Sequence, residues 1–171
     1  MNIENEDTKL PVRAPGTGIA LEGESAPSVN RISDLKCREL IAKAMDMLQK
    51  AYTPYSHFKV GAALLTKAGK IYGGCNIENA AYGPSNCAER TAFFNAVSDG
   101  NLEFAAIAIV GGPEGRIKDF CPPCGVCRQV MMEFCKPKEF VILLQNDKGE
   151  TKKFTLEEML PLGFGPADLE K

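Results

Sequence analysis

The chain has 171 residues, of which 44% are hydrophobic and 25% are charged. This length and composition fit one globular domain with a core of ordinary size, and they exclude a wholly disordered chain. Twenty basic and 22 acidic residues give a net charge of −2, whereas proteins that grip polynucleotide phosphates carry a surplus of Lys and Arg.

The N-terminal stretch 1–31 differs from the rest of the chain. Prolines at positions 11, 15 and 27 and the run Gly16-Thr17-Gly18 lie in it without any apolar period. This pattern predicts a flexible leader over 1–31 and a single catalytic domain over 32–171. The first residues are polar and acidic, unlike a secretory signal, and no apolar run reaches the roughly 18 residues of a membrane span. We therefore expect a cytoplasmic protein that binds no membrane.

Helix and strand patterns alternate after the leader. Ser33 or Asp34 can cap a first helix, whose apolar stripe runs from Cys37 to Leu48 and which Thr53-Pro54 is expected to stop. This alternation predicts a layered α/β domain with one central sheet packed by helices on both faces. The later expected elements are strands 59–66 and 71–75, helix 87–97, strand 104–110 ended by Gly111-Gly112-Pro113, helix 124–134, strand 140–144, a short strand after the turn 146–149, and a final short helix capped by Thr155 and Glu158.

Cysteine usage is unusual. The seven cysteines are too few for a disulfide scaffold, and Cys121, Cys124 and Cys127 form overlapping C-x-x-C pairs. In a reducing compartment, such clustering indicates metal binding or catalysis before it indicates disulfides. Cys37, Cys75 and Cys135 are expected to be small core residues or helix-flank thiols, and Met131 and Met132 are expected to fill the core or an interface.

Two motifs place cysteines at the predicted starts of helices. They are Cys87-Ala88-Glu89 and, further along, Pro123-Cys124-Gly125-Val126-Cys127. Free N–H groups and the helix dipole favour a thiolate at such a position. Two helix starts that face each other could hold one zinc through Cys87, Cys124 and Cys127, with a fourth position open for water. Zinc lowers the pKa of such a water to about 7, and Glu89, beside a ligand, could carry the proton.

Neighbouring residues allow several interpretations. Arg90 is the first candidate to hydrogen-bond a thiolate and withdraw charge from it, and Arg128 is either a second such residue or a solvated helix residue. Cys121 could complete a closed structural zinc site, and Cys124 with Cys127 could be a redox pair. His57 is the only histidine, but three thiolates and water already complete a zinc shell.

The two motifs match the zinc deaminase signature in its three-cysteine form. Over about residues 33–170 the chain closely resembles the homotetrameric cytidine deaminases of the pyrimidine salvage pathway. The resemblance rests on five separated blocks, residues 55–63, 74–80, 87–91, 123–129 and 164–166. It implies a three-layer α/β/α sandwich with a central mixed five-stranded sheet.

The resemblance also assigns roles. It implies that Cys87, Cys124 and Cys127 bind one zinc per subunit and that Glu89 is the proton shuttle. For the substrate it implies that Asn76 and Glu78 hold the ribose hydroxyls, that Phe58 stacks near the pyrimidine, that Ala80 and Tyr82 reach a neighbouring subunit's site, and that Phe164 closes a pocket from another subunit.

The implied activity is hydrolysis of cytidine and deoxycytidine to uridine and deoxyuridine with release of ammonia. The implied assembly is a homotetramer in which neighbouring subunits complete each active site. The implied binding partner is a small nucleoside, and no nucleic acid is expected to bind. One rival is a deaminase of polynucleotides, nucleotides or nucleoside-like antibiotics. The other is a non-enzymatic zinc or redox module, and Glu89 argues against it because a structural site has no use for that carboxylate.

Overall fold

A computed structural model describes residues 32–169, so the leader expected over 1–31 lies outside the described residues. Five strands form one sheet in the order β2-β1-β3-β4-β5. Strands β3 and β4 are parallel and the other neighbours are antiparallel, which confirms a mixed five-stranded sheet. The strands are β1 (Phe58–Thr66), β2 (Ile71–Cys75), β3 (Phe104–Pro113), β4 (Val141–Gln145) and β5 (Thr151–Thr155).

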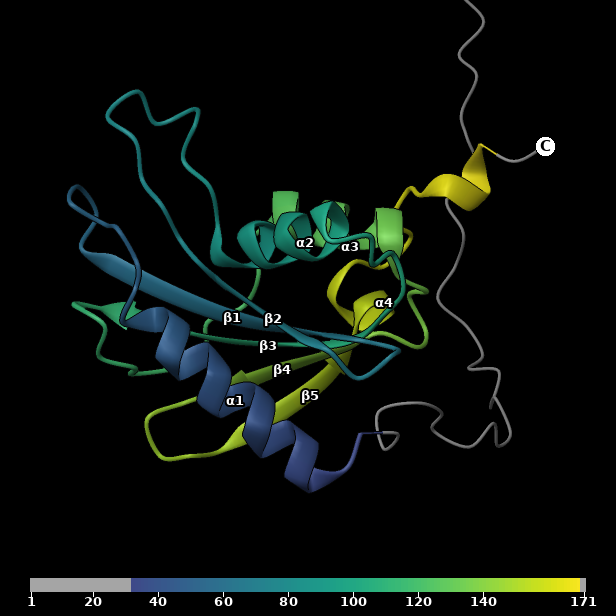
Figure 1. Cartoon of the computed structure of the whole chain (residues 1–171), viewed down its shortest axis with the longest axis horizontal. Coiled ribbons are helices and arrows are strands. Elements are labelled where there is room, and N and C mark those ends of the chain that lie inside the picture. Colours follow the sequence, from purple (N-terminus) through teal and green to yellow (C-terminus); the bar gives the residue numbers. More distant parts are fainter. Residues whose placement is uncertain (1–31, 170–171) are drawn as a thin grey trace, which may run out of the picture.

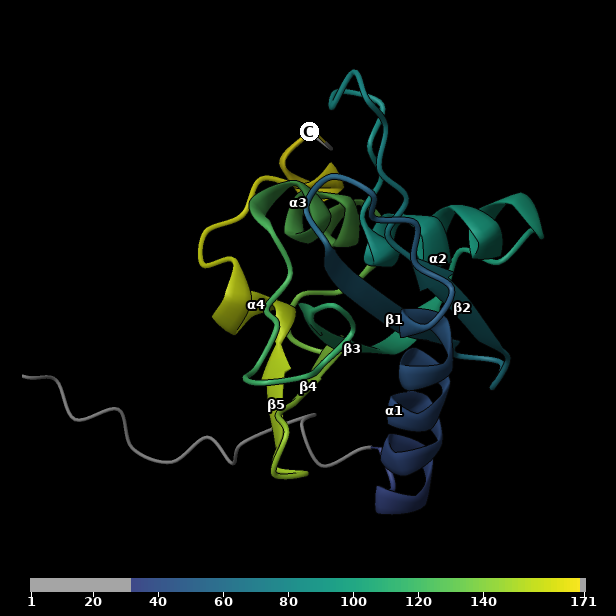
Figure 2. The ribbon, with the colours of Figure 1, turned by 90° about the vertical axis from the view of Figure 1, so that its left-hand side faces the viewer.

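Helices cover both faces of this sheet (Figures 1 and 2). Helix α1 (Asp34–Leu48) packs on one face, while α2 (Ala88–Ser98), α3 (Gly125–Phe134) and the short α4 (Leu156–Met159) pack on the other. A separate cluster of buried apolar side chains lies on each face. The expected α/β/α sandwich is therefore confirmed. Over residues 32–169, no helix has the length and apolar character needed to cross a membrane.

Helix α1 follows its apolar stripe but ends earlier than expected. The Ser33 hydroxyl accepts a hydrogen bond from the Lys36 N–H, and the stripe from Cys37 to Leu48 is buried. The helix ends at Leu48 and not at Thr53-Pro54, because the chain turns away to pair with another segment. The Tyr52 N–H donates to the Asn76 carbonyl at 3.0 Å, which brings the end of α1 beside the end of β2.

Strand β3 runs further than expected. The Gly111-Gly112-Pro113 run does not end it, because β1 stays paired with β3 up to Phe58 opposite Pro113. A Cβ on Gly112 would lie 1.9 Å from the Arg116 carbonyl oxygen, so this glycine permits a close backbone approach. The other expected elements match within a few residues, including the Thr155–Glu158 capping box that opens α4.

Candidate active site

Helices α2 and α3 begin close together on the same face of the sheet. A Cβ on Gly74 of β2 would lie 2.2 Å from the Ala88 carbonyl oxygen, so β2 and α2 pack almost backbone to backbone. This contact determines where α2 begins. Cys87 and Cys124 are the N-cap residues of α2 and α3, both in extended backbone conformation, and neither side chain caps its own helix. Their sulfur atoms are therefore available for another partner.

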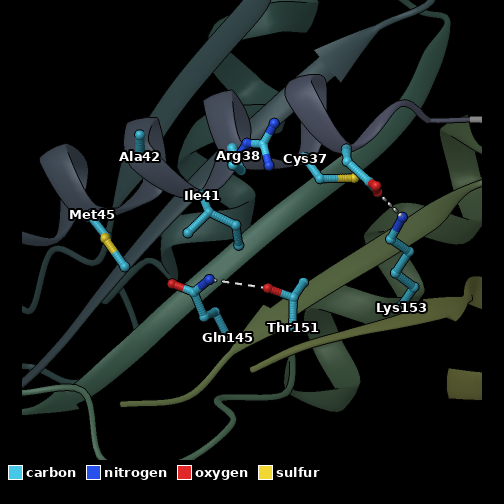
Figure 3. Close-up of a pocket in the computed structure, with 9 residues that line it drawn as sticks. Cys37, Arg38, Ile41, Ala42, Met45, Gln145, Thr151 and Lys153 are labelled. Atoms are coloured by element: carbon cyan, nitrogen blue, oxygen red, sulfur yellow. Dashed lines mark hydrogen bonds and ion pairs between the residues drawn. The ribbon is translucent and has the colours of Figure 1, made fainter. Parts of the chain in front are cut away.

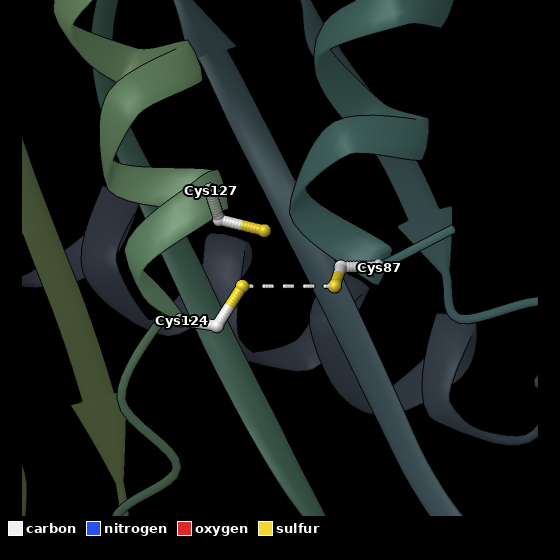
Figure 4. Close-up of side chains that lie close together, drawn as sticks. All are labelled: Cys87, Cys124 and Cys127. Atoms are coloured by element: carbon white, nitrogen blue, oxygen red, sulfur yellow. Dashed lines mark hydrogen bonds between the residues drawn. The ribbon is translucent and has the colours of Figure 1, made fainter. Parts of the chain in front are cut away.

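The sulfur atoms of Cys87, Cys124 and Cys127 point toward one another from the two helix starts (Figure 4). All three lie within 4.8 Å of one another, and the Sγ atoms of Cys87 and Cys124 are 3.9 Å apart. Tetrahedral zinc with Zn–S bonds of about 2.3 Å separates its sulfur ligands by about 3.8 Å. Soft thiolate donors at this spacing fit zinc, and over residues 32–169 no other group of three potential ligands is present.

Charge at the thiols is unevenly shared. Hydrogen bonding with Cys127, followed by that with Arg90, lowers the pKa of the Cys87 thiol to about 5. The same bond between the two cysteines raises the pKa of Cys127, so Cys87 becomes a thiolate first. The Arg90 Nη2 donates to the Cys87 Sγ at 3.6 Å and to the Ser85 carbonyl at 3.2 Å. Desolvation alone would lower the pKa of Arg90, but the hydrogen bond to Cys87 and the charges of Cys87 and Cys127 together raise it.

Arg128 is neither a hydrogen-bond donor to the thiols nor a solvated helix residue, the two roles expected from the sequence. Its Nε donates to the Pro123 carbonyl and its Nη1 to the Met159 carbonyl, both at 2.8 Å. The side chain is half-buried and joins the segment before α3 to the end of α4. It therefore braces the start of α3 and leaves the thiols to Arg90.

Glu89 is a buried carboxyl beside the thiols. Its residue is only 4% exposed, and burial is the main cause that raises its pKa to about 7. A carboxyl with such a pKa can both accept and release a proton near neutral pH.

Glu89, Cys87 and Cys124 line a cavity of about 250 Å³, and we call these residues, with the neighbouring Cys127, its thiol end. Asn76 and Glu78 line the same cavity, and we call these two its polar end.

The polar end is already hydrogen-bonded to its own chain. Asn76 accepts from the Val60 N–H and donates to the Phe58 carbonyl, each at 2.8 Å. The Glu78 carboxylate accepts from the backbone N–H of Tyr55 at 3.0 Å, from that of Ser56 at 3.2 Å and from the Ser56 hydroxyl. The hydroxyl is the first cause of a lowered pKa of Glu78. Asn76 thus holds the first residues of β1 and Glu78 holds the segment before it, roles that the sequence did not indicate.

Four expected substrate residues lie outside this cavity. Phe58 is 41% exposed and lines an adjoining cavity of about 530 Å³, which shares Cys121 and Pro122 with the first. Ala80, Tyr82 and Phe164 are exposed, the aromatic ones by 73% and 59%. Ala80 and Tyr82 belong to the long segment between β2 and α2 that projects from the domain (Figure 1).

Two alternative ligands are separate from the thiol group. Cys121 lies outside the three-cysteine cluster, and desolvation is the main cause that raises its pKa to about 12. A Cβ on Gly111 would lie 2.8 Å from its sulfur, so Cys121 packs against β3 as well as lining the cavity. His57 is exposed, with its Nδ1 3.8 Å from a Glu114 carboxylate oxygen. The closed four-cysteine site is therefore not formed.

Another cavity, of about 400 Å³, lies between α1 and the β4–β5 edge on the other face of the sheet (Figure 3). Its polar side chains largely pair with one another: Gln145 donates to Thr151 at 3.1 Å, and Lys153 forms an ion pair with Asp34 at 3.5 Å. It contains no carboxyl beside a thiol cluster. The buried carboxyl and the converging thiols lie at the other cavity, the one that Glu89 lines.

A buried carboxyl beside three converging thiols, on an α/β/α sandwich, defines a zinc-dependent hydrolase of the deaminase class. The family model for the cytidine and deoxycytidylate deaminase zinc-binding region matches residues 36–144. Cytidine deaminase from Sporosarcina psychrophila is 50% identical over 131 residues, which cover 77% of this chain and 93% of that protein. The chain therefore belongs to the cytidine and deoxycytidylate deaminase family.

Two further relatives define how far the likeness extends. The crystal structure of cytidine deaminase from Burkholderia pseudomallei superposes with a TM-score of 0.68 at 48% identity, over 74% of this chain and 98% of that one. Blasticidin-S deaminase from Bacillus cereus is 34% identical over 74% of this chain and 90% of that protein. Membership of the family therefore leaves the substrate to be argued from the cavity.

Proposed function

We propose that this protein is a cytoplasmic cytidine deaminase of pyrimidine salvage. It would hydrolyse cytidine and deoxycytidine to uridine and deoxyuridine and release ammonia. The observation that carries the proposal is the buried Glu89, which lines one small cavity with Cys87 and Cys124 of the three converging thiols and with Asn76 and Glu78. A structural zinc module or a redox pair would have no use for a buried carboxyl there.

The thiol end performs the chemistry in this proposal. Cys87, Cys124 and Cys127 would hold the zinc, which supplies a nucleophile at neutral pH by lowering the pKa of water to about 7. Glu89 accepts a proton from the attacking water and delivers it to N3 of the cytosine ring. The water oxygen bonds to C4, and Glu89 takes the remaining proton of the resulting hydroxyl and transfers it to the amino group, so that the C4–N bond breaks, the C4 carbonyl forms and ammonia leaves. Arg90 moderates the negative charge of the thiolates through its bond to Cys87.

The polar end would receive the ribose. Asn76 uses one of its two amide protons on the Phe58 carbonyl, so the second is available to a ribose oxygen. Each carboxylate oxygen can accept about two hydrogen bonds, so Glu78 keeps acceptor capacity for a hydroxyl. No Lys or Arg lines this cavity, whereas Glu78 and Glu89 do. This charge disfavours the 5′-phosphate of a nucleotide and supports an uncharged nucleoside.

Neighbouring subunits would complete the site. Tyr82 and Phe164 are large, exposed aromatic side chains, and covering such surface is favourable. We propose a homotetramer in which Ala80, Tyr82 and Phe164 reach the nucleoside site of a neighbour. Phe58, at the edge of the adjoining cavity, would stack near the pyrimidine of its own subunit's substrate.

The test is loss of cytidine absorbance with the wild type and the Glu89→Gln variant. The amide keeps the shape of the side chain but cannot carry the proton, so turnover should fall by about 10²–10⁴-fold. Zinc content and folding should stay normal. Glu114→Gln is the matched control, because it makes the same change at an exposed carboxylate outside the cavity. Near-normal turnover by Glu89→Gln would contradict the proposed role. Faster turnover of cytidine 5′-monophosphate or blasticidin S than of cytidine would contradict the substrate.

A further inference from the structure

Ser56 connects two of the residues proposed to hold the nucleoside. Its hydroxyl donates to Oε1 of Glu78 and accepts from the Phe58 N–H at 3.0 Å. Its own N–H, at 3.2 Å, and that of Tyr55, at 3.0 Å, donate to the other oxygen, Oε2. The Glu78 carboxylate is thus held by three donors from two consecutive residues. One hydroxyl joins the carboxylate at the polar end to the backbone of the aromatic residue beside it.

The backbone around Ser56 is built to keep this arrangement. His57 has a φ of 55°, a left-handed conformation that turns the chain so that the Phe58 N–H faces back toward the Ser56 hydroxyl. The His57 N–H donates to the Thr53 carbonyl at 3.2 Å, and the His57 carbonyl accepts from the Glu114 N–H at 2.7 Å. Both bonds anchor the turn to neighbouring segments, so Ser56 has a defined position although it is exposed.

We propose that Ser56 is a positioning residue that determines specificity for nucleosides with ribose hydroxyls. This inference rests on the proposed function. Ser56 does not line the cavity, so it acts through Glu78. Two of the three donors occupy Oε2, and the serine hydroxyl orients Oε1, which is the oxygen with acceptor capacity left for a ribose hydroxyl. The Phe58 backbone is held independently by its pairing with Pro113 of β3, so the serine is not required to place the aromatic residue.

The consequence is a specific pattern of substrate dependence. If Ser56 orients Glu78 for a ribose hydroxyl, the loss of its hydroxyl matters only for substrates that offer such a hydroxyl. Cytidine offers two, whereas 2′,3′-dideoxycytidine offers neither. A residue that merely stabilised the fold would affect both substrates equally.

The experiment compares Ser56→Ala with wild type on cytidine and on 2′,3′-dideoxycytidine. For cytidine, kcat/KM should fall about tenfold, mainly through KM, as expected for a lost hydrogen bond to a charged group. For 2′,3′-dideoxycytidine it should change less than about twofold, within the spread of a neutral surface substitution. Ser56→Thr keeps the hydroxyl and should restore the cytidine value. Ser98→Ala is the matched control, because that hydroxyl bonds only the Asn95 carbonyl at the far end of α2.

Combining Ser56→Ala with Glu78→Gln provides the second readout. The double variant should be hardly worse on cytidine than Glu78→Gln alone, because the serine acts through the carboxylate. Equal losses of kcat/KM on both substrates, or additive effects of the two substitutions, would overturn the inference while the wild type remained a cytidine deaminase. Absence of wild-type turnover would instead overturn the proposed function, and this inference with it.

Discussion

The thiol end of the cavity is positioned by packed helix starts, whereas the half-buried residues of the polar end lie in the segment that follows β2. At the thiol end, Cys127 and Glu89 are 1% and 4% exposed, although Cys124 is exposed, and helix α2 is packed directly onto β2 at Gly74. At the polar end, Glu78 is held by the segment before β1, and Tyr82, in the segment that continues from Glu78, is 73% exposed.

In the proposed function, this difference separates the residues that perform the chemistry from those that recognise the substrate. To bind one ion together, three thiols must each be placed to within a few tenths of an ångström of the position that the ion requires. Only well-packed elements give that accuracy. A nucleoside can be gripped by several weaker contacts, so loops and neighbouring subunits can supply them. Substitutions at the thiol end should therefore abolish function or unfold the protein, whereas those at the polar end should mainly change substrate affinity.

The largest effect is expected from the proposed ligands. Cys87→Ser, Cys124→Ser or Cys127→Ser should remove most of the zinc and with it all measurable turnover, because a hydroxyl is a poor zinc donor at neutral pH. Metal analysis of the purified variants checks this against one zinc per chain in the wild type. Cys121→Ser is the control and should keep most of its zinc. A variant that kept its full metal content would contradict the assignment of the substituted cysteine as a zinc ligand.

A pair of glycine substitutions tests the packing directly. Alanine at Gly74 would place its Cβ 2.2 Å from the Ala88 carbonyl oxygen and 2.4 Å from the Ala92 nitrogen, so α2 must shift. We expect Gly74→Ala to lower the free energy of unfolding by about 2–3 kcal/mol and to weaken zinc binding. Gly83→Ala, where the nearest atom is 3.8 Å away, should change it by less than about 0.5 kcal/mol. Urea unfolding measures the free energy of unfolding of each variant, and metal titration measures its zinc binding. Equal effects of the two substitutions would contradict the proposed difference in packing between Gly74 and Gly83.

Local patterns predicted most of the fold. The stripe from Cys37 to Leu48, the strand 71–75 and the capping box at Thr155 all follow from side chains within one or two turns of each other. The errors fall where distant segments meet. Helix α1 stops at Leu48 because Tyr52 pairs with Asn76, and β3 continues through its glycines because β1 lies beside it.

In the candidate site, too, local patterns could be predicted, whereas contacts between distant segments could not. Cys87, Glu89, Cys124 and Cys127 could be found from spacing alone, since helix starts place them. The bonds from Ser56 to Glu78 could not, because they join residues 22 positions apart through an irregular turn. Arg128 was misjudged for a related reason: its partner carbonyl at Met159 is 31 residues away.

The contribution of neighbouring subunits can be tested at Phe164. Its ring is exposed in the single chain, while its carbonyl is fixed by the Gln129 side chain at 2.9 Å, so the residue is presented outward at a defined place. We expect Phe164→Ala to raise KM for cytidine about tenfold, consistent with the loss of one buried aromatic contact, and to leave zinc content normal. Light scattering should show a tetramer for the wild type. A fully active monomer at all concentrations would exclude the proposed assembly.

The smallest effect is expected from removal of the leader. The stretch 1–31 has no apolar period and lies outside the residues that carry the family resemblance. A chain that begins at Asn30 should keep kcat/KM for cytidine within about twofold and lose less than about 0.5 kcal/mol of unfolding free energy. A chain that begins at Lys36 is the informative comparison. It lacks Ile32, which is only 9% exposed, and the Ser33 cap of α1, so it should lose about 2 kcal/mol or more. If the Asn30 chain failed to fold or to turn over cytidine, the leader would have to be counted as part of the catalytic domain.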